Sequence, residues 1–413
     1  MSAADRKVEL GVLLSGHRVG ALRGLETRRV RFVPDPQWLQ GGQRPRLGWT
    51  FLVDPRLPAD QTLLPAWFEN LLPERGSPLR RKICEHHGLH EHDGPALLEV
   101  LGQDLPGAVE VQGVVEPDDL DDDEPPRSFA GRLRFSVAGM QPKLSMIRRD
   151  DRLLLPAKGE FGDCYVKIAG SQYADLPAVE AATMSWARTV GLEVPEHWLV
   201  SIDKLVDVDE NFLGKASSAY AIERFDRKGG ERIHQEDFAQ ALNFQPYDKY
   251  GGTGRLAVSY DSLARLVADA CGDAGRAAFI ERVAFMVACG DHDAHLKNWS
   301  FQWPADQLRP RLSPCYDLVA TVAWPEFGWG APDEPEMALP FAGSRRFAEI
   351  DAARVRTFAA RSEAPDAPER FMAALERAKH AWAEQASHAP ECMRTALREH
   401  WARVPILRLL GGL

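Results

Sequence analysis

The sequence of 413 residues lacks the signatures of several common protein classes. Its six cysteines lie far apart and form no C-x-x-C pair, so we expect reduced thiols in a cytoplasmic protein. No stretch reaches the ~18 apolar residues that a membrane-spanning helix needs, and the N-terminus has no apolar run typical of a signal peptide. Because the formal net charge is -10, the chain as a whole does not attract nucleic acid.

The glycine-rich phosphate-binding motifs are also missing. Residues 135–146 contain one glycine, Gly139, and therefore match neither G-x-G-x-x-G nor Walker A. Serine, glycine and Lys143 in this segment can still form a short phosphate-covering turn, although a plain hairpin has the same pattern. Residues 251–254 are glycine-rich but follow no predicted strand, so we expect a loop there.

What is present is the spacing of a protein-kinase catalytic loop. Asp293 is followed five residues later by Asn298, and Asp317 comes nineteen residues after that. Phosphoryl transfer needs a carboxylate to orient the attacking hydroxyl and oxygen ligands for Mg²⁺. We therefore predict that Asp293 is the catalytic base and that Asn298 and Asp317 are the metal ligands.

Two upstream residues supply the ion pair of a kinase nucleotide lobe. Lys167 lies in an alternating segment, 164–168, that predicts a half-buried strand. Glu180 follows within a predicted helix that has Pro177 near its start and Gly191 after its end. Such a pair directs the lysine toward ATP phosphates. The alternative is a lysine at a strand edge and a glutamate on a solvated helix face.

Several motifs together resemble the HipA family of serine/threonine kinase toxins. They lie at residues 136–143, 223–227, 234–242, 293–298 and 316–317, with further matches at 12–22, 71–74 and 101–109. The resemblance implies an α+β, protein-kinase-like bilobal fold. It has a β-rich nucleotide lobe, a mostly helical C-terminal lobe and an extra N-terminal α/β subdomain.

The resemblance also implies an activity and partners. The chain would use ATP and Mg²⁺ to phosphorylate a protein, with an aminoacyl-tRNA synthetase as the known substrate class. A small DNA-binding HipB-like antitoxin would neutralise it, and the pair would repress their own operon. Contact with DNA would then be mainly indirect, with arginines such as Arg345 and Arg398 as the alternative direct contacts.

Carried over to this sequence, the resemblance assigns the nucleotide site. The expected nucleotide-binding residues are Ala138, Gly139, Met140, Gln141, Pro142, Lys143, Lys167, Glu180, Glu223, Arg224, Phe225, His295 and Tyr316. Residues 223–225 would form the adenine hinge, after a strand predicted from residue 220. Ser136 matches the autophosphorylated serine, where a phosphate would repel the phosphates that the loop must hold. The sequence departs from the family at Ile168, where proline is usual, and at Asp291, where asparagine is frequent.

The chain divides into four predicted parts. These are an N-terminal subdomain at 1–115, an acidic proline-containing linker at 116–130, a nucleotide lobe at 131–225 and a catalytic lobe at 226–413.

Other interpretations stay open from sequence alone. The chain could be a pseudokinase that serves as a transcriptional corepressor, or a small-molecule phosphotransferase that shares the catalytic spacing. The histidines at 86, 87, 90 and 92 could suggest zinc, but a polar helix end is favoured because no cysteine pair accompanies them. His234 could be a base, but its context favours a helix start with Glu236 and Asp237 in the first turn.

Overall fold

The computed structural model describes most of the chain. It covers residues 9–24, 29–41, 46–56, 64–113, 143–157, 160–170, 173–208, 213, 216–253, 257–305, 307–324, 326 and 334–413. The chain divides into two compact units. One unit comprises Met1–Ser171, Val200–Tyr247 and Gln302–Leu308, and the other Gln172–Leu199, Asp248–Phe301 and Arg309–Leu413.

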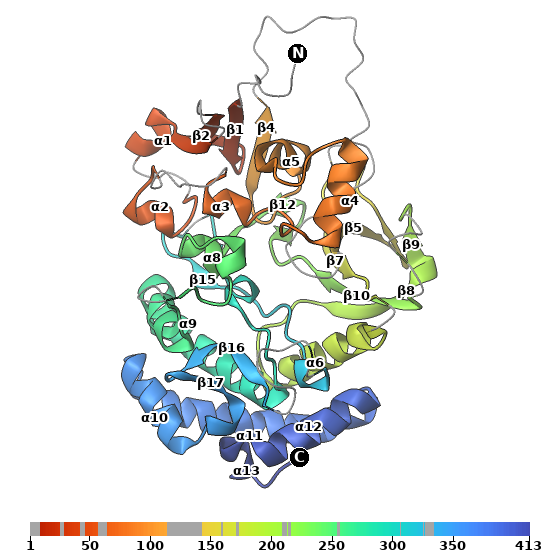
Figure 1. Ribbon diagram of the computed structural model, residues 1–413, viewed down its shortest axis with the longest axis vertical. Coiled ribbons are helices and arrows are strands. Elements are labelled where there is room, and N and C mark those ends of the chain that lie inside the picture. The colour runs from red at the N-terminus through yellow and green to blue at the C-terminus, as the bar shows by residue number, and fades with distance from the viewer. Residues whose placement is uncertain are drawn as a thin grey trace, which may run out of the picture. The chain divides into compact units, whose positions relative to one another are not determined.

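The first unit begins with a four-stranded antiparallel sheet of order β3-β2-β1-β4, labelled in Figure 1. Its strands are β1 (Glu9–Leu14), β2 (His17–Gly24), β3 (Val30–Pro34) and β4 (Val109–Gly113). Ser15 and Gly16 join β1 to β2 with φ angles of 50° and 76°, which suits a tight hairpin turn.

Five helices accompany this sheet. They are α1 (Pro36–Gln40), α2 (Thr50–Val53), α3 (Ala66–Glu69), α4 (Pro78–His87) and α5 (Gly94–Leu101). Phe32 of β3 packs its ring against Phe51 and Phe68, with centroids 5.5 and 5.4 Å away. This aromatic cluster forms the core of the N-terminal part. Pro73 and Gly76 lie between α3 and α4 and keep them separate.

A second, six-stranded sheet has the order β8-β10-β7-β5-β6-β9. Its strands are β5 (Lys143–Arg149), β6 (Arg152–Leu154), β7 (Cys164–Lys167), β8 (His197–Ser201), β9 (Leu205–Val206) and β10 (Ser218–Glu223). The predicted strands around Lys167 and after residue 220 are therefore confirmed. Because β7 has a neighbour on each side, Lys167 does not lie on an edge strand.

The segment after this sheet corrects one prediction. His234 does not open a helix: it begins strand β13 (His234–Asp237), and helix α8 (Phe238–Ala241) starts after it. Asp237 is the N-cap of α8, and its side chain and that of Gln240 form a capping box. Glu236 is fully buried, and its carboxylate accepts hydrogen bonds from the indole N–H groups of Trp67 and Trp303, both 3.1 Å away. The short hairpin β11 (Arg227–Lys228) and β12 (Glu231–Arg232) precedes β13.

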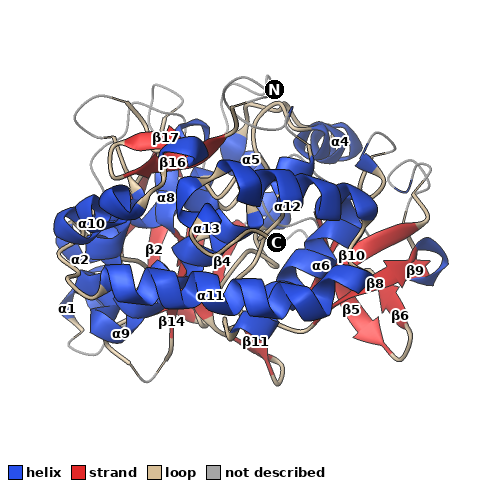
Figure 2. Cartoon of the chain, turned by 90° about the horizontal axis from the view of Figure 1, so that it is seen from below, coloured by secondary structure: helices blue, strands red, loops and turns tan. Residues whose placement is uncertain are grey.

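The second unit is mostly helical. Its long helices are α6 (Leu176–Val190), α9 (Tyr260–Cys289), α10 (Ala352–Arg361), α11 (Ala367–Gln385) and α12 (Glu391–Arg403), followed by α13 (Pro405–Arg408). Figure 2 shows α11 running beside α9, and the indole of Trp186 on α6 donates to the Ala378 carbonyl of α11. Helix α6 ends at Gly191 in the left-handed conformation, as predicted. Before α10, strands β16 (Glu336–Phe341) and β17 (Ser344–Arg346) form an antiparallel hairpin.

Candidate functional site

Two lysines lie directly opposite each other in the six-stranded sheet. Lys143 of β5 pairs with Lys167 of β7, and both side chains are more than nine-tenths buried. The Lys167 ammonium lies 5.5 Å from the centroid of the Tyr220 ring on β10. Like charges opposite each other are unfavourable, and buried ammonium groups need negative charge nearby. This row of side chains therefore suits a polyanion such as a chain of phosphates.

The predicted adenine hinge follows at the end of β10. Glu223 is exposed and is the last residue of the strand. The backbone N–H of Arg224 donates to the Asp163 carbonyl at 2.8 Å, and the Phe225 carbonyl accepts from Gln302 at 2.8 Å. These two groups already have partners within the first unit. An adenine ring would thus have to use the other backbone groups of residues 223–225.

The catalytic segment in the second unit is a tight turn. The His295 N–H donates to the Asp293 carbonyl at 2.7 Å, and residues Leu296–Asn298 form a 3-10 helix. The side-chain nitrogen of Asn298 donates to the same Asp293 carbonyl at 3.1 Å. Since the amide nitrogen is used in this way, the amide oxygen Oδ1 is left as the ligand atom that Mg²⁺ prefers.

Asp293 is held by one neighbour at its carboxylate and by another at its backbone. Oδ1 accepts a hydrogen bond from the Tyr250 hydroxyl at 2.9 Å, and the backbone N–H donates to Asp291 Oδ1 at 2.9 Å. Burial raises the pKa of Asp291 to about 8, and the negative charges of Asp293 and Asp317 add to the rise. Asp293 and Asp317 therefore both lie close enough to Asp291 in the second unit for their charges to act on it.

Arg282 connects the catalytic segment to the segment that carries Asp317. This residue of α9 is buried, and its Nη2 donates to the carbonyls of Asn298 at 2.7 Å and Tyr316 at 3.4 Å. The guanidinium also lies over the Trp299 ring, 4.3 Å from its centroid. A second link comes from the Tyr316 hydroxyl, which donates to the Lys297 carbonyl at 3.0 Å.

Asp317 adopts an unusual backbone conformation. Its φ angle is 54°, in the left-handed region that non-glycine residues rarely occupy. Such strain persists where the surrounding structure enforces it, and it clusters at functional sites. Val319, two residues later, donates its N–H to Asp291 Oδ2 at 3.5 Å. The segment around Asp317 is thus bonded to the residue that also holds Asp293.

The predicted site residues fall into three groups. The second unit brings together Asp293, His295, Asn298, Tyr316 and Asp317, and the first unit holds Lys143, Lys167 and residues 223–225. Glu180 belongs to the second unit and is buried on α6, which excludes the alternative of a solvated helix face. Ser136, Ala138, Gly139, Met140, Gln141 and Pro142 lie outside the described residues. The roles of all these residues stay predictions.

Sequence reasoning missed Tyr250 and Arg282 and treated Asp291 only as a departure from the family. A charged residue within the apolar stretch 279–290 was a usable signal for Arg282, because a buried guanidinium needs acceptors. Tyr250 carries no local signal, since its contact with Asp293 spans forty-three residues.

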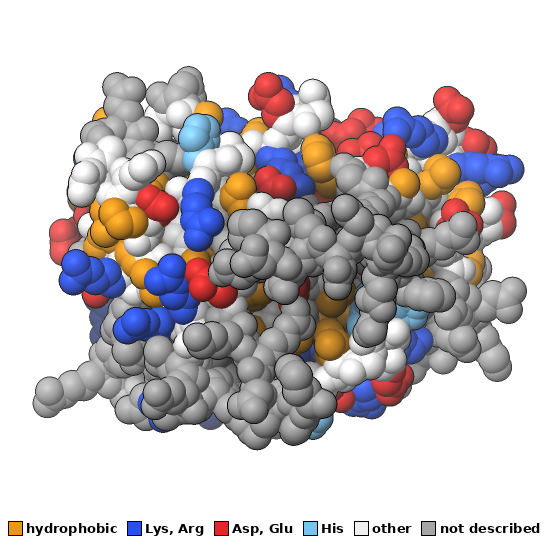
Figure 3. Space-filling model, turned by 90° about the horizontal axis from the view of Figure 1, so that it is seen from above, with side chains coloured by type: hydrophobic (Ala, Val, Ile, Leu, Met, Phe, Trp, Pro, Cys, Tyr) orange, Lys and Arg blue, Asp and Glu red, His pale blue; other side chains and the backbone are white. Residues whose placement is uncertain are grey.

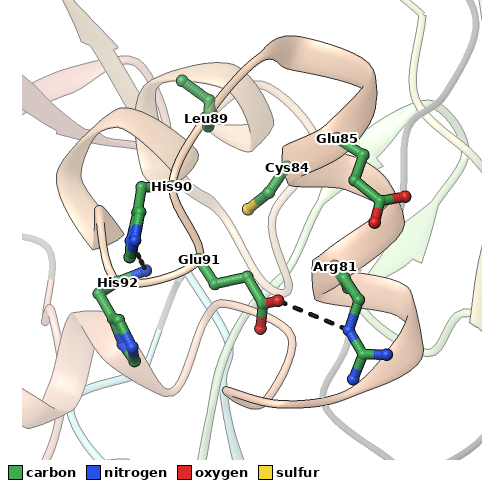
Figure 4. Close-up of a pocket in the computed structure, with 7 residues that line it drawn as sticks. All are labelled: Arg81, Cys84, Glu85, Leu89, His90, Glu91 and His92. Atoms are coloured by element: carbon green, nitrogen blue, oxygen red, sulfur yellow. Dashed lines mark hydrogen bonds and ion pairs between the residues drawn. The ribbon is translucent and has the colours of Figure 1, made fainter.

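Part of the histidine cluster lines a pocket of about 360 Å³ in the first unit, shown in Figure 4. His86 and His87 lie in the last turn of α4, while His90 and His92 line the pocket with Cys84. Among the residues that the structure describes, no three His, Cys, Asp or Glu side chains are grouped to hold a metal ion.

Surface charge, helix length and the cysteines add three observations. On the face in Figure 3, basic and acidic side chains are interspersed among the coloured residues. In the described part of the chain, no helix is both long enough and apolar enough to cross a bilayer. All six cysteines are free, as expected.

Comparisons with known proteins cover nearly the whole chain. The family model of the HipA-like C-terminal domain matches residues 135–389, and that of the HipA N-terminal domain matches residues 10–112. A putative kinase of Sinorhizobium fredii, Y4dM, is 34% identical over 390 residues, covering 90% of this chain and 92% of its own. The serine/threonine-protein kinase toxin HipA of Shewanella oneidensis is 27% identical, covering 73% and 72%.

A solved structure shares the fold. A chain of the complex of Shewanella oneidensis HipA, HipB and operator DNA superposes with a TM-score of 0.70 at 24% identity, covering 95% of this chain and 94% of that one. The likeness confirms the predicted α+β, kinase-like architecture.

Proposed function

Because this chain belongs to the HipA family, we propose that it is an ATP- and Mg²⁺-dependent serine/threonine protein kinase that acts as a toxin. Asp293 would orient the attacking hydroxyl as the base, and Lys143 and Lys167 would bind the phosphates. Asn298 and Asp317 would hold Mg²⁺, which would offset the charge that develops on the transferred phosphoryl group.

The observation that carries this proposal is the bridge made by Arg282. By binding the carbonyls of both Asn298 and Tyr316, it fixes the segment of the proposed base to the segment of the second metal ligand. Phosphoryl transfer depends mainly on such positioning, because the protein contributes little covalent chemistry. The paired, buried Lys143 and Lys167 support the phosphate-binding part independently.

The substrate and partners form the finer part of the proposal. The chain would phosphorylate Ser136 in itself and a component of translation such as an aminoacyl-tRNA synthetase. A HipB-like antitoxin would neutralise it, and the two together would repress their operon, with DNA contacts made mainly by the antitoxin. The presence of HipB and operator DNA in the complex of the Shewanella protein supports this arrangement. So does the formal charge of -10.

The proposal is tested by expressing the chain without its antitoxin. Growth should stop, and protein phosphorylation should increase in ³²P-labelled cells. Asp293→Ala and Asp317→Ala should each remove both effects, because each deletes a group that the transfer requires.

Asp273→Ala is the matched control. Asp273 lies in the same unit, but its side chain is 90% exposed and forms a surface ion pair with Arg276. This variant should behave like the unmodified chain. Full toxicity of both Asp293→Ala and Asp317→Ala would contradict the kinase assignment. Repression of the operon without any phosphorylation would instead support the corepressor alternative.

A further inference from the structure

One short segment of the N-terminal domain contacts the sheet that carries the two lysines. We name residues 103–108, which join α5 to β4, the docking segment. It lies within the N-terminal family match, whereas β5, β7 and β10 lie within the C-terminal match. All of these residues belong to the first compact unit. The docking segment therefore links two domains that are separate in sequence.

Asp104 is the centre of this link. Its Oδ2 accepts from the Ser145 hydroxyl of β5 at 2.7 Å, and its Oδ1 accepts from Arg224 Nη1 at 2.8 Å and from Arg227 Nη2 at 3.1 Å. Asp226 completes the cluster, because Arg224 donates to both of its oxygens at 2.9 Å. Two carboxylates thus face two guanidinium groups, and the charges balance.

The burial of this cluster makes the balance important. The side chains of Arg224 and Asp226 are 0% and 1% exposed, and that of Asp104 is 3% exposed. Burial alone would raise the pKa of Asp104, but Arg224 and Arg227 hold it below its ordinary value. Removing one carboxylate from such a site leaves an arginine with less counter-charge in a dry environment.

Backbone contacts extend the link beyond Asp104. The Gly107 N–H donates to Asp226 Oδ2 at 2.7 Å, and the Gly107 carbonyl accepts from Arg227 Nη1 at 2.9 Å. Gly107 has a φ angle of 76°, and a β-carbon there would lie 2.8 Å from the Gln235 nitrogen. Only glycine fits this position without movement.

The cluster lies on the same face of the sheet as the two lysines. Side chains two residues apart in a strand share a face, so Ser145 follows Lys143 on that face, and Tyr165 precedes Lys167. Ser145 and Tyr165 are directly paired, and the Arg224 guanidinium lies 4.5 Å from the centroid of the Tyr165 ring. Arg224 also belongs to the predicted adenine hinge. Asp104 therefore contacts the lysine-bearing strand β5 and the hinge at the same time.

From this placement we propose that Asp104 of the N-terminal domain is a positioning residue for the nucleotide site, acting through Ser145 and Arg224. It links the segment that follows β10 to β5, across the intervening strand β7, and so sets where residues 223–225 lie relative to Lys143 and Lys167. The inference rests on the proposed kinase function. Nucleotide affinity should then depend on a residue of the N-terminal domain, as well as on the residues that touch the nucleotide.

The test compares Asp104→Asn with the matched control Glu69→Gln in the full chain. Glu69 is also buried and paired with a buried arginine, Arg80, but its ion pairs with Arg75 and Arg80 lie within the N-terminal domain. Isothermal titration with Mg·ATP should show Kd raised by about tenfold or more for Asp104→Asn, because small misplacements of binding groups are costly. The phosphorylation assay should show KM for ATP raised more than kcat is lowered. Glu69→Gln should leave both close to those of the unmodified chain.

Two further measurements keep the inference independent of folding and of the kinase proposal. Ser145→Ala removes one contact of Asp104 without leaving an unbalanced charge, and it should raise Kd by a smaller factor in the same direction. Hydrogen exchange of the nucleotide-free protein should become faster in residues 143–149 and 222–227 in Asp104→Asn, but not in Glu69→Gln.

The outcomes separate the two claims. If the unmodified chain binds no Mg·ATP, the proposed function fails, while the exchange pattern still decides the role of Asp104. If Asp104→Asn and Glu69→Gln change exchange in the same residues, or if ATP affinity is equal in both, Asp104 has no positioning role.

Discussion

Arg282 shows how one side chain organises the candidate site. It sits on α9 among the buried residues Ile280 and Val283, and its contacts go to backbone carbonyls of residues 298 and 316. Every residue type has a backbone carbonyl. A sequence motif therefore does not show which residues Arg282 binds. The acidic and amide residues at 293, 298 and 317 were predictable from spacing, because the chemistry demands those side chains.

Replacement of Arg282 tests whether this side chain is needed for the rate of phosphoryl transfer. Arg282→Leu keeps the apolar packing but leaves the carbonyls of Asn298 and Tyr316 without their donor. We expect kcat for protein phosphorylation to fall by at least about tenfold, since the base and the metal ligand would no longer be held together. Steady-state kinetics measure this effect.

Arg276→Leu serves as the comparison for Arg282→Leu. Arg276 lies on the same helix as Arg282, but it contacts Asp273 and Glu363 and not the catalytic segment. This variant should keep kcat within about twofold. An Arg282→Leu enzyme with unchanged kcat would show that the bridge is dispensable.

The free energy of unfolding of the first unit should fall at acidic pH, because Asp226 becomes protonated. Burial opposes ionisation, but Arg224 and Arg227 lower the pKa of Asp226 from 3.8 to about 2. Because the folded pKa is depressed, the stabilisation is present above pH ~4 and is lost as pH falls toward 2, and it amounts to about 2 kcal/mol. Urea unfolding between pH 5 and pH ~2 measures this. Asp226→Asn should be less stable at neutral pH and should lack this part of the acid dependence; an identical pH dependence in both proteins would contradict the assignment.

At the scale of elements, the strands and helices with strong local signals were predictable. The alternation of residues 164–168 and the proline and glycine around α6 gave β7 and α6 correctly. The start of α8 was misplaced because Glu236 and Asp237 resemble a first helical turn. In the structure Glu236 accepts from Trp67 and Trp303, residues that are distant in sequence, and this requires an extended segment.

The position of the α8 N-cap gives a test at this scale. Asp237→Ala removes the oxygen that accepts from the Gln240 N–H at 2.8 Å, and should cost about 1 kcal/mol of unfolding free energy. Asp237→Asn keeps a capping oxygen and should differ from the unmodified protein by only a few tenths of a kcal/mol. Equal denaturation midpoints for the alanine and asparagine variants would argue that the helix starts elsewhere.

At the scale of the whole molecule, the sequence predicted the family and the kinase-like fold but not the grouping of segments. An acidic, proline-containing linker at 116–130 suggested that the N-terminal subdomain stands apart. The first compact unit contains both that subdomain and strands β5, β6, β7, β9 and β10 of the six-stranded sheet. The contacts that join them, such as Asp104 with Arg224, span more than a hundred residues. A single sequence does not reveal pairs at that separation, because neither residue carries a local pattern.

The measurement that tests the central claim most directly is phosphopeptide mapping of the purified protein after incubation with Mg·ATP. We predict that the unmodified chain gains a phosphate on Ser136. Asp293→Asn, which keeps the size of the base but removes its charge, should gain none, while Asp273→Asn should match the unmodified chain. If the unmodified chain gains no phosphate at any residue, or if Asp293→Asn is phosphorylated as fast, the proposed catalytic centre is wrong.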